Sequence, residues 1–218
     1  MRTFIVHGHH EPASFNAAMT QTAVAALSDL GHEVIVSDLH AMGFDPVSDR
    51  RNFTTVANPD RLRQQDEEAL ASRVNGYVAE LQEEMDKLAW CNLLILQFPL
   101  WWLGPPAILK GWIDRVFSVG RSYGGGRWFA TGLHRGKRAM CSLTVGGLEA
   151  SYGEGGHYAP VEQILYPLHQ GVFRFTGFAV LEPFVVYGPS RIDDRARAEC
   201  LARYRARLAA LEDIVATA

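Results

Sequence analysis

The order of apolar and helical segments constrains the fold of this chain most. Apolar runs of strand length lie at residues 4–6, 34–36, 93–96, 138–145 and about 179–187, and segments with helical periodicity lie between them. Strands that are joined by helices in this way form right-handed crossovers, which produce a parallel sheet with helices on both faces. We therefore predict an α/β fold with five parallel strands. A length of 218 residues favours one domain that spans residues 1–218.

Apolar spacing also predicts where the helices lie. Ser14 and Gly31 have the residue types of a helix N-cap and a helix end, and apolar residues recur at helical spacing between them. A second stripe, from Leu70 to Leu88, predicts one continuous helix before the strand at 93–96. Further helices are expected from about Pro106, near 161–175, and at the end of the chain, where the apolar face comprises Leu201, Tyr204, Leu208, Leu211 and Val215.

Charge and composition exclude several functions. The formal net charge is −3, and no cluster of lysine and arginine forms the stripe that binds nucleic-acid phosphates. No apolar run reaches the length of a membrane span, and the first residues enter a strand without a signal peptide. We expect a cytoplasmic protein that neither binds nucleic acid nor crosses a membrane. Cys91, Cys141 and Cys200 are widely spaced, which suits reduced, buried thiols better than disulfides.

A stiff aromatic loop follows the third predicted strand. The sequence of residues 98–112 is FPLWWLGPPAILKGW, in which prolines fix the backbone and two adjacent tryptophans offer flat apolar surface. Ligands of open α/β sheets bind beyond the carboxyl ends of the strands, and this loop lies at such an end. We expect the loop to form one wall of a site for a planar ligand.

The turn after the first predicted strand lacks the G-x-G-x-x-G pattern of dinucleotide-binding folds. Ser14 and Asn16 instead offer a hydroxyl and an amide beside the free amides of a helix N-terminus, a combination that binds anions. An ordinary N-cap would also explain Ser14. His7, His9 and His10 have no carboxylate or cysteine at matching metal-ligand spacing, so we expect no metal.

The other strand ends offer aromatic and backbone surface. We expect neither the nucleophile elbow of an α/β-hydrolase nor a pair of catalytic carboxylates at these ends. Gly146 and Gly147 end the fourth predicted strand and allow a ligand to approach the backbone closely. Together with the tryptophan loop and the tyrosines at 123, 152 and 158, they favour a flat redox cofactor that supplies the chemistry itself.

Several motifs of this chain occur in the same order in one known family. They are His9-x-x-x-x-Ser14-Phe15-Asn16, the segment FPLWWLGPPAILKGW, Thr144-x-Gly146-Gly147, and residues 37–46, 166–167 and 177–183. The chain resembles the NAD(P)H:quinone oxidoreductases of DT-diaphorase type over nearly its whole length. That resemblance implies a flavodoxin-like fold with strand order 2-1-3-4-5. It also implies FAD as the cofactor, with FMN as the alternative, and NADPH or NADH as the electron donor.

The resemblance further assigns cofactor contacts to residues of this sequence. His9, Ser14, Phe15 and Asn16 would contact the flavin pyrophosphate and ribityl region, and Arg197 would lie near the adenosine end. Pro99, Leu100, Trp101, Trp102 and Leu103 would hold one edge and face of the ring system. Thr144, Val145, Gly146 and Gly147 would present backbone to its pyrimidine side.

The resemblance also implies catalytic and substrate-binding residues. Tyr152 matches a tyrosine that hydrogen-bonds the flavin as negative charge develops, which would lower the barrier to hydride transfer. The family histidine that partners this tyrosine falls on Tyr158, and His157 lies one place earlier, so both are candidates. The substrate would contact Trp102, Tyr123, Tyr158 and Phe175. Two departures from the family pattern are Trp101, in place of a glutamine, and Gly125, in place of a tyrosine, which should open the pocket.

These expectations describe a homodimer with its active sites at the interface. It would take a hydride from NAD(P)H onto the flavin and pass two electrons to a quinone, and Phe175 or the Tyr123 loop would reach the partner's flavin. One alternative is a flavin-binding ancillary subunit of a potassium efflux system. A one-electron carrier is disfavoured, because such carriers have an acidic surface whereas this chain is near neutral.

Overall fold

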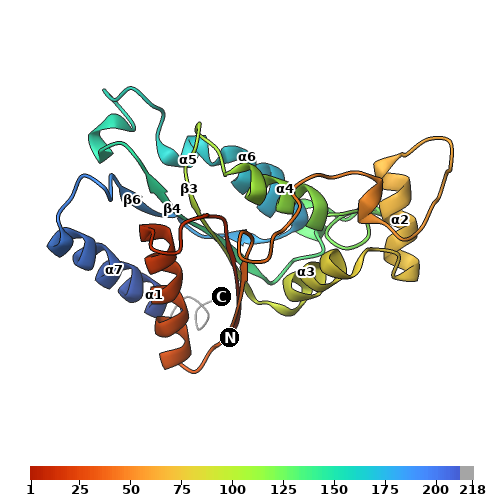
Figure 1. Cartoon of the computed structure of the whole chain (residues 1–218), viewed down its shortest axis with the longest axis horizontal. Coiled ribbons are helices and arrows are strands. Elements are labelled where there is room, and N and C mark those ends of the chain that lie inside the picture. Colours follow the sequence, from red (N-terminus) through yellow and green to blue (C-terminus); the bar gives the residue numbers. More distant parts are fainter. Residues whose placement is uncertain (212–218) are drawn as a thin grey trace.

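A parallel sheet forms the centre of the computed structural model, which describes residues 1–211 (Figure 1). The strands are β1 (Arg2–His7), β2 (Glu33–Asp38), β3 (Leu93–Pro99), β4 (Arg138–Val145), β5 (Ala179–Val180) and β6 (Phe184–Tyr187). Their order is β2-β1-β3-β4-β5, with β6 also paired to β4, and every pairing is parallel. The predicted flavodoxin-like order is confirmed.

The fifth predicted strand is divided into two. β5 pairs with the start of β4, at Arg138 and Ala139, and β6 pairs with its end, from Ser142 to Val145. The residues between them include Pro183, which has no N–H to donate to the sheet. The sixth strand is thus the second half of the predicted fifth, on the same edge of the sheet.

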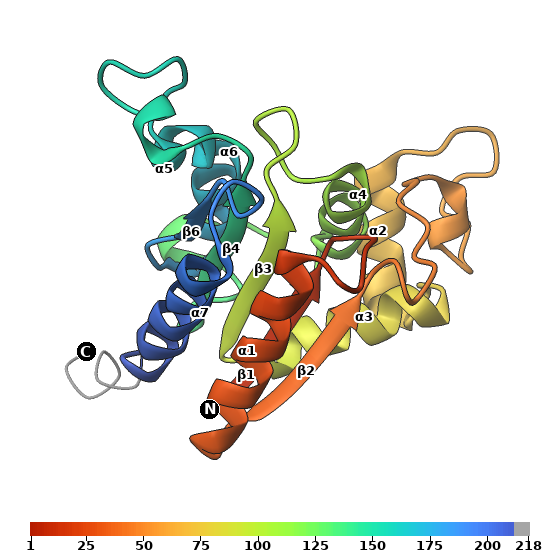
Figure 2. The same cartoon turned by 60° about the vertical axis from the view of Figure 1, so that its left-hand side comes forward.

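Helices cover both faces of the sheet. α1 (Phe15–Asp29) and α7 (Asp194–Ala209) pack side by side on one face, as both views show (Figures 1 and 2). The other face is covered by α3 (Ala79–Trp90), α4 (Ala107–Val116), α5 (Val161–Ile164), α6 (Tyr166–Leu168) and the π-type turns of η4 (His169–Arg174). Short 3₁₀ turns lie at η1 (Arg50–Asn52), η2 (Phe129–Thr131) and η3 (Glu149–Ser151).

Alternate residues of each central strand enter the two cores. In β1, Phe4 and Val6 belong to the core beneath α3 and α4, whereas Ile5 packs with Met19 and Leu27 of α1. All seven residues of β3 are buried. This explains why the central strands have continuous apolar sequences without alternation, because polar side chains would be buried on either face.

The predicted helix from Leu70 to Leu88 is wrong, because the chain forms two helices there. α2 (Gln64–Val74) ends at Asn75, whose φ of 55° is left-handed, and α3 begins only at residue 79. A Cβ atom on Gly76 would lie 2.4 Å from the Thr55 side chain, so the loop before α2 packs directly against this break. The 39–66 segment therefore interrupts a helix that the apolar spacing alone would continue.

Other helix predictions are confirmed in part. Ser14 caps α1 by accepting a hydrogen bond from the Ala17 N–H at 3.1 Å, and Gly31 follows the helix with φ of 77°. The helix expected near 161–175 is divided among α5, α6 and η4, where Pro167 removes one backbone donor. Leu208 and Leu211 are buried as expected, and Val215 lies outside the described residues. Cys91 and Cys141 are buried thiols, and Cys200 is partly buried.

A buried polar network anchors the helix that follows the tryptophan loop. Glu84 of α3 is fully buried and accepts hydrogen bonds from the Trp112 indole and the Ser37 hydroxyl, both at 2.8 Å. Lys87 pairs with the same carboxylate at 2.8 Å. On the neighbouring face of α4, Gly111 lies against Pro46, and a Cβ atom there would be 2.3 Å from the Pro46 carbonyl oxygen. These contacts fix α4, and with it the end of the loop that leaves β3.

Candidate functional site

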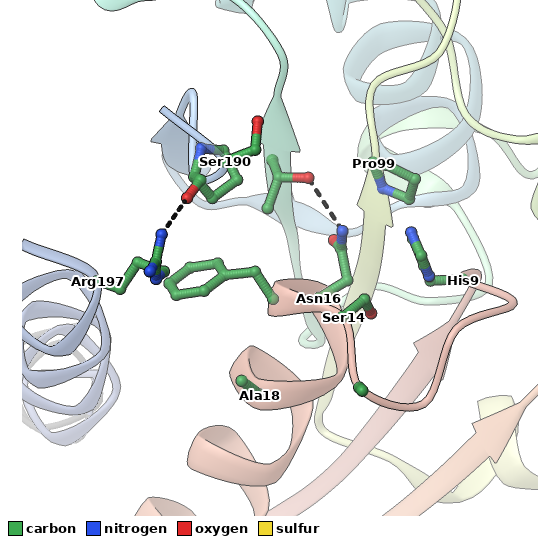
Figure 3. A pocket seen from close by; sticks show the side chains of 11 residues that line it. His9, Ser14, Asn16, Ala18, Pro99, Ser190 and Arg197 are labelled. Atoms are coloured by element: carbon green, nitrogen blue, oxygen red, sulfur yellow. Dashed lines mark hydrogen bonds between the residues drawn. The ribbon is translucent and has the colours of Figure 1, made fainter. Parts of the chain in front are cut away.

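A cavity of about 450 Å³ lies at the carboxyl ends of the central strands (Figure 3). Figure 2 shows that the loop after β3 and the loop before α5 both project beyond this edge. Seven residues that line it were predicted from the sequence: His9, Ser14, Phe15, Asn16, Pro99, Thr144 and Arg197. They come from the first strand end, from α1, from β3, from β4 and from α7, so the fold brings together segments that are far apart in the chain.

The N-terminus of α1 provides unpaired donors to this cavity. The Ser14 side chain and carbonyl accept hydrogen bonds from the Ala17 and Ala18 N–H groups. Within residues 1–211, the backbone N–H groups of Phe15 and Asn16 have no acceptor. Free amides at a helix N-terminus carry partial positive charge, so this end of the cavity favours an anionic group.

The Asn16 side chain joins the α1 N-terminus to two strands. Its Nδ2 donates to Thr144 Oγ1 at 3.0 Å, and its Oδ1 accepts from Gln97 Nε2 at 2.9 Å. All three side chains are buried. Asn16 therefore holds the helix start against β3 and β4, and the neighbouring residues of the turn face the cavity.

Arg197 of α7 forms the opposite side of the cavity (Figure 3). Its Nη1 donates to the Pro189 carbonyl at 3.1 Å and also to the Ile192 carbonyl, and its guanidinium pairs with Asp194. The side chain is 34% exposed and Asp194 is 97% exposed, so the guanidinium remains accessible at the cavity.

Four lining residues were not predicted: Ala13, Ala18, Pro189 and Ser190. Pro189 and Ser190 directly follow β6, which is another carboxyl strand end. The rule that located the other loops would have found them if it had been applied to the last strand.

The tryptophan loop forms a tight reversal in left-handed conformation. Trp101 and Gly104 exchange two backbone hydrogen bonds of 2.9 and 3.0 Å, and the residues between them, Trp102 and Leu103, have φ of 52° and 59°. Positive φ is unfavourable for large side chains, and such strain is concentrated at functional sites. Trp102 is fully exposed and Leu103 is 48% exposed, whereas Leu100 is half-buried and donates to the Thr144 carbonyl at 2.8 Å.

Trp101 lies over the turn that follows β1. Its ring centroid is 6.1 Å from His9 and 5.9 Å from His10, and the two imidazoles are stacked at 4.8 Å. Partial burial lowers the pKa of His9, and the neighbouring His10 lowers it further. At neutral pH His9 is therefore mainly a neutral hydrogen-bonding group of the cavity.

Two of the three predicted catalytic side chains lie together. Tyr152 and Tyr158 stack with ring centroids 5.1 Å apart, and Tyr187 of β6 lies 5.7 Å from Tyr152. Burial raises the pKa of Tyr152, the nearby Tyr158 raises it further, and a hydrogen bond with the Gly147 backbone opposes the rise. His157 is exposed, and among the described residues its ring has no stacking partner.

The end of β4 lies beside this tyrosine pair. Val145 is buried, whereas Gly146 is exposed, with open space where a Cβ atom would be. A Cβ atom on Gly147 would lie 3.0 Å from the Tyr152 ring. The glycine thus allows the ring to pack on the backbone, next to the accessible strand end at Gly146.

Tyr123 and Phe175, predicted to contact substrate, lie in a second cavity. Their ring centroids are 5.4 Å apart, and the Phe129 ring lies 5.5 Å from Phe175. This cavity is lined by α2, α4 and η4, not by the strand ends. One protomer therefore does not bring Tyr123 and Phe175 together with Tyr152.

Residues 120–124, GRSYG, have the Gly-x-Ser-x-Gly spacing of a hydrolase nucleophile elbow, although no such elbow was expected from the sequence. They follow a helix, α4, whereas a nucleophile elbow follows a strand. Ser122 is 1% exposed and hydrogen-bonds with His134 Nε2 at 3.1 Å. Burial lowers the pKa of His134 to about 3. This serine is consequently a buried structural residue.

The described residues 1–211 contain neither a candidate metal site nor a candidate membrane-spanning helix. No group of three or more His, Cys, Asp or Glu side chains there is arranged to hold a metal ion. In the same range, no helix is both long and apolar enough to cross a membrane.

Comparisons with known proteins agree with this architecture. A family model described as flavodoxin-like fold matches residues 1–208. NAD(P)H dehydrogenase [quinone] 1 of Cavia porcellus is 40% identical over 95% of this chain and 76% of its own length. Ribosyldihydronicotinamide dehydrogenase [quinone] of Rattus norvegicus is 36% identical over 95% of this chain and 90% of its own.

A solved structure supports the same assignment. A Klebsiella pneumoniae protein, designated a candidate quinone reductase, superposes with a TM-score of 0.93 at 35% identity, over 97% of this chain and 85% of its own. The sequence motifs, the strand order and these matches agree along nearly the whole chain. The chain therefore belongs to the NAD(P)H:quinone oxidoreductases with a flavodoxin-like fold, a family of oxidoreductases.

Proposed function

We propose that this protein is a flavin-dependent enzyme that takes a hydride from NAD(P)H and passes two electrons to a quinone. The observation that carries the proposal is the strand-end cavity, where free α1 amides and an accessible arginine surround one space. The names of the relatives, which are quinone dehydrogenases, support the reaction class.

The cavity and the strand ends that continue from its lining residues Pro99 and Thr144 suit a flavin in three respects. The Phe15 and Asn16 amides supply donors for a phosphate group at the α1 N-terminus, and the Arg197 guanidinium supplies donors for the adenosine side of FAD. Gly146, whose Cβ position is open, leaves backbone available to a ring edge. The tryptophan turn supplies apolar surface for a ring face. Bound flavin would supply the acceptor for the hydride and the donor of two electrons.

The protein's own residues would hold the reactants and stabilise charge. Tyr152 keeps its proton at neutral pH, because burial and Tyr158 raise its pKa. Its hydroxyl is therefore a hydrogen-bond donor for negative charge that develops nearby. Both candidate partners are exposed, but only Tyr158 stacks on Tyr152 among the described residues, which favours Tyr158.

We further propose FAD as the physiological cofactor, with residues 1–218 as one flavin-binding domain in a cytoplasmic homodimer. Tyr123 and Phe175 lie away from the strand-end cavity of their own protomer. They could contact substrate only at a flavin of a second copy, so the substrate role that we assign to them requires the dimer.

Replacing Arg197 with glutamine tests the FAD assignment. We expect FAD to bind about tenfold more weakly, which corresponds to one lost charge-assisted hydrogen bond, and FMN to bind almost unchanged. Flavin fluorescence titration of the flavin-free protein measures both affinities. R195Q is the matched control, because Arg195 lies on the same helix, is 88% exposed and pairs only with Glu199 among the described residues. Equal weakening of FAD and FMN would mean that Arg197 does not contact the adenosine end.

The proposed reaction is tested directly with purified protein. We expect a yellow protein whose released flavin is identified by chromatography, whose visible absorption is bleached by NADPH under anaerobic conditions, and whose colour returns with menadione. NADH and NADPH are compared at equal concentration. A colourless protein that binds neither FAD nor FMN would refute the proposal, and bleaching that menadione does not reverse would refute quinone as the acceptor.

The same experiment separates the alternatives. A flavin-binding ancillary subunit of a potassium efflux system would bind flavin but would not turn over quinone with NAD(P)H. The relatives are named as dehydrogenases and reductases, which does not favour that alternative.

A further inference from the structure

The cavity that contains Tyr123 has an acidic side as well as an aromatic one. Its volume is about 430 Å³, and it lies between α2, α4 and η4. Both views show α2 at one end of the molecule, away from α1 and α7 (Figures 1 and 2). Phe117, Tyr123 and Phe175 line it from one side, and Gln64, Gln65 and Glu68 of α2 line it from the other.

The aromatic side can accommodate a planar molecule. Tyr123 and Phe175 are tilted by 58° with centroids 5.4 Å apart, and both rings are partly buried. Beyond Tyr123 the chain continues with Gly124 and Gly125, and no atom lies within 4 Å of the Cβ position of Gly125. The space next to Tyr123 is therefore open at this position among the described residues.

Glu68 places a carboxylate in this cavity without a cation. The residue is 4% exposed. Its Oε1 accepts from Gln64 Nε2 at 2.9 Å, and its Oε2 accepts from the Val119 N–H at 2.8 Å. Among the described residues it forms no ion pair. A carboxylate has about four acceptor positions, so about two remain for a ligand.

Glu68 acts on the same space as Tyr123. Burial raises the pKa of Tyr123, and the charge of Glu68 raises it further. Burial also raises the pKa of Glu68 itself. Among the described residues, no lysine, arginine or histidine lines this cavity, and the other acidic residue there, Asp114, is exposed and pairs with Lys110. A buried carboxylate without a counter-charge disfavours anions and is stabilised by a donor or a cation.

We propose that Glu68 determines acceptor specificity, so that the cavity prefers planar quinones bearing a positive charge or a hydrogen-bond donor over anionic ones. The inference rests on the proposed quinone reductase function and on the substrate role of Tyr123 and Phe175. It adds a residue of α2 to the residues expected to contact the acceptor.

Replacing Glu68 with glutamine tests the inference. The amide has the same shape, and its oxygen can still accept from the Val119 N–H, so mainly the charge is removed. The probes are a naphthoquinone with a quaternary ammonium side chain and a naphthoquinone sulfonate. The measured quantity is the kcat/KM for the cationic probe divided by the kcat/KM for the anionic probe. For E68Q we expect this ratio to fall about tenfold or more, because a nearby charge in a partly buried site is lost. E83Q is the control, because it removes a carboxylate on α3 that does not line this cavity.

A second variant keeps the test valid if E68Q does not fold. Gln65 is exposed and lines the same cavity, so Q65E adds a carboxylate at low cost to the fold. We expect it to raise the same ratio. Ratios that stay unchanged in the folded variants, while both probes are reduced, would refute the role of Glu68 and leave the proposed function intact. A wild-type protein that reduces neither probe nor menadione would instead refute the proposed function, and this inference with it.

Discussion

Replacing Tyr152 with phenylalanine should slow flavin reduction by NADPH about 100-fold, the effect typical of removing one donor from a charge-stabilising site. The reason is that Tyr152 stays protonated at neutral pH, since burial and Tyr158 raise its pKa. Phenylalanine retains the stacking with Tyr158 and removes only the hydroxyl. The loss should appear in the chemical step, with little change in the affinity for NADPH.

Stopped-flow absorbance of the flavin-bound enzyme measures the rate of flavin reduction by NADPH in a single turnover. Y166F is the matched control, because Tyr166 is 63% exposed on α6 and lies outside the strand-end cavity. We expect its reduction rate to equal that of the wild type. If Y152F also reduces at the wild-type rate, Tyr152 has no part in stabilising charge during hydride transfer.

Replacing Gly111 with alanine should destabilise the fold by about 3 kcal/mol, the upper range for overpacking in a core. The added Cβ atom would lie 2.3 Å from the Pro46 carbonyl oxygen and 2.4 Å from the Pro46 Cβ. The Pro46 atoms are backbone and ring atoms, which cannot rotate away as a flexible side chain could. α4 or the segment before η1 must therefore move.

Urea unfolding of the variant and the wild type, in the same cofactor state, measures the change in the free energy of unfolding. G171A is the matched control, because no atom lies within 4 Å of that Cβ position and φ is not left-handed. We expect G171A to be as stable as the wild type or slightly more so, since alanine restricts the unfolded chain. Equal stability of G111A and G171A would show that α4 adapts to the added atom.

Local sequence patterns were sufficient to predict most of the fold. Continuous apolar runs located β1, β3 and β4, because strands buried on both faces are built mainly from apolar side chains. Ser14 and Gly31 marked the ends of α1, because capping depends on residues close in sequence. Strand order could be predicted from the family resemblance and not from periodicity, which carries no information about which strands are neighbours.

The wrong predictions depend on contacts between distant residues. The apolar stripe from Leu70 to Leu88 continues through the break, where the left-handed cap at Asn75 and the packing of Thr55 on Gly76 together end the helix. The prediction of the candidate site from the sequence was limited in the same way. Ser14 and Pro99 were identified in their own loops, whereas the separate cavity of Tyr123 and Phe175 follows from the placement of α2 and η4.

The left-handed turn at Trp102 gives the protein an internal optical reporter. Indole emission shifts to longer wavelength in water, and Trp102 is fully exposed, whereas Trp112 is fully buried against Phe4 and Phe117. The two side chains should therefore contribute at opposite edges of the emission spectrum. A molecule that covers the turn and does not absorb at the wavelengths of indole emission would reduce the long-wavelength edge and leave the other in place, so binding of such a molecule can be followed without a label.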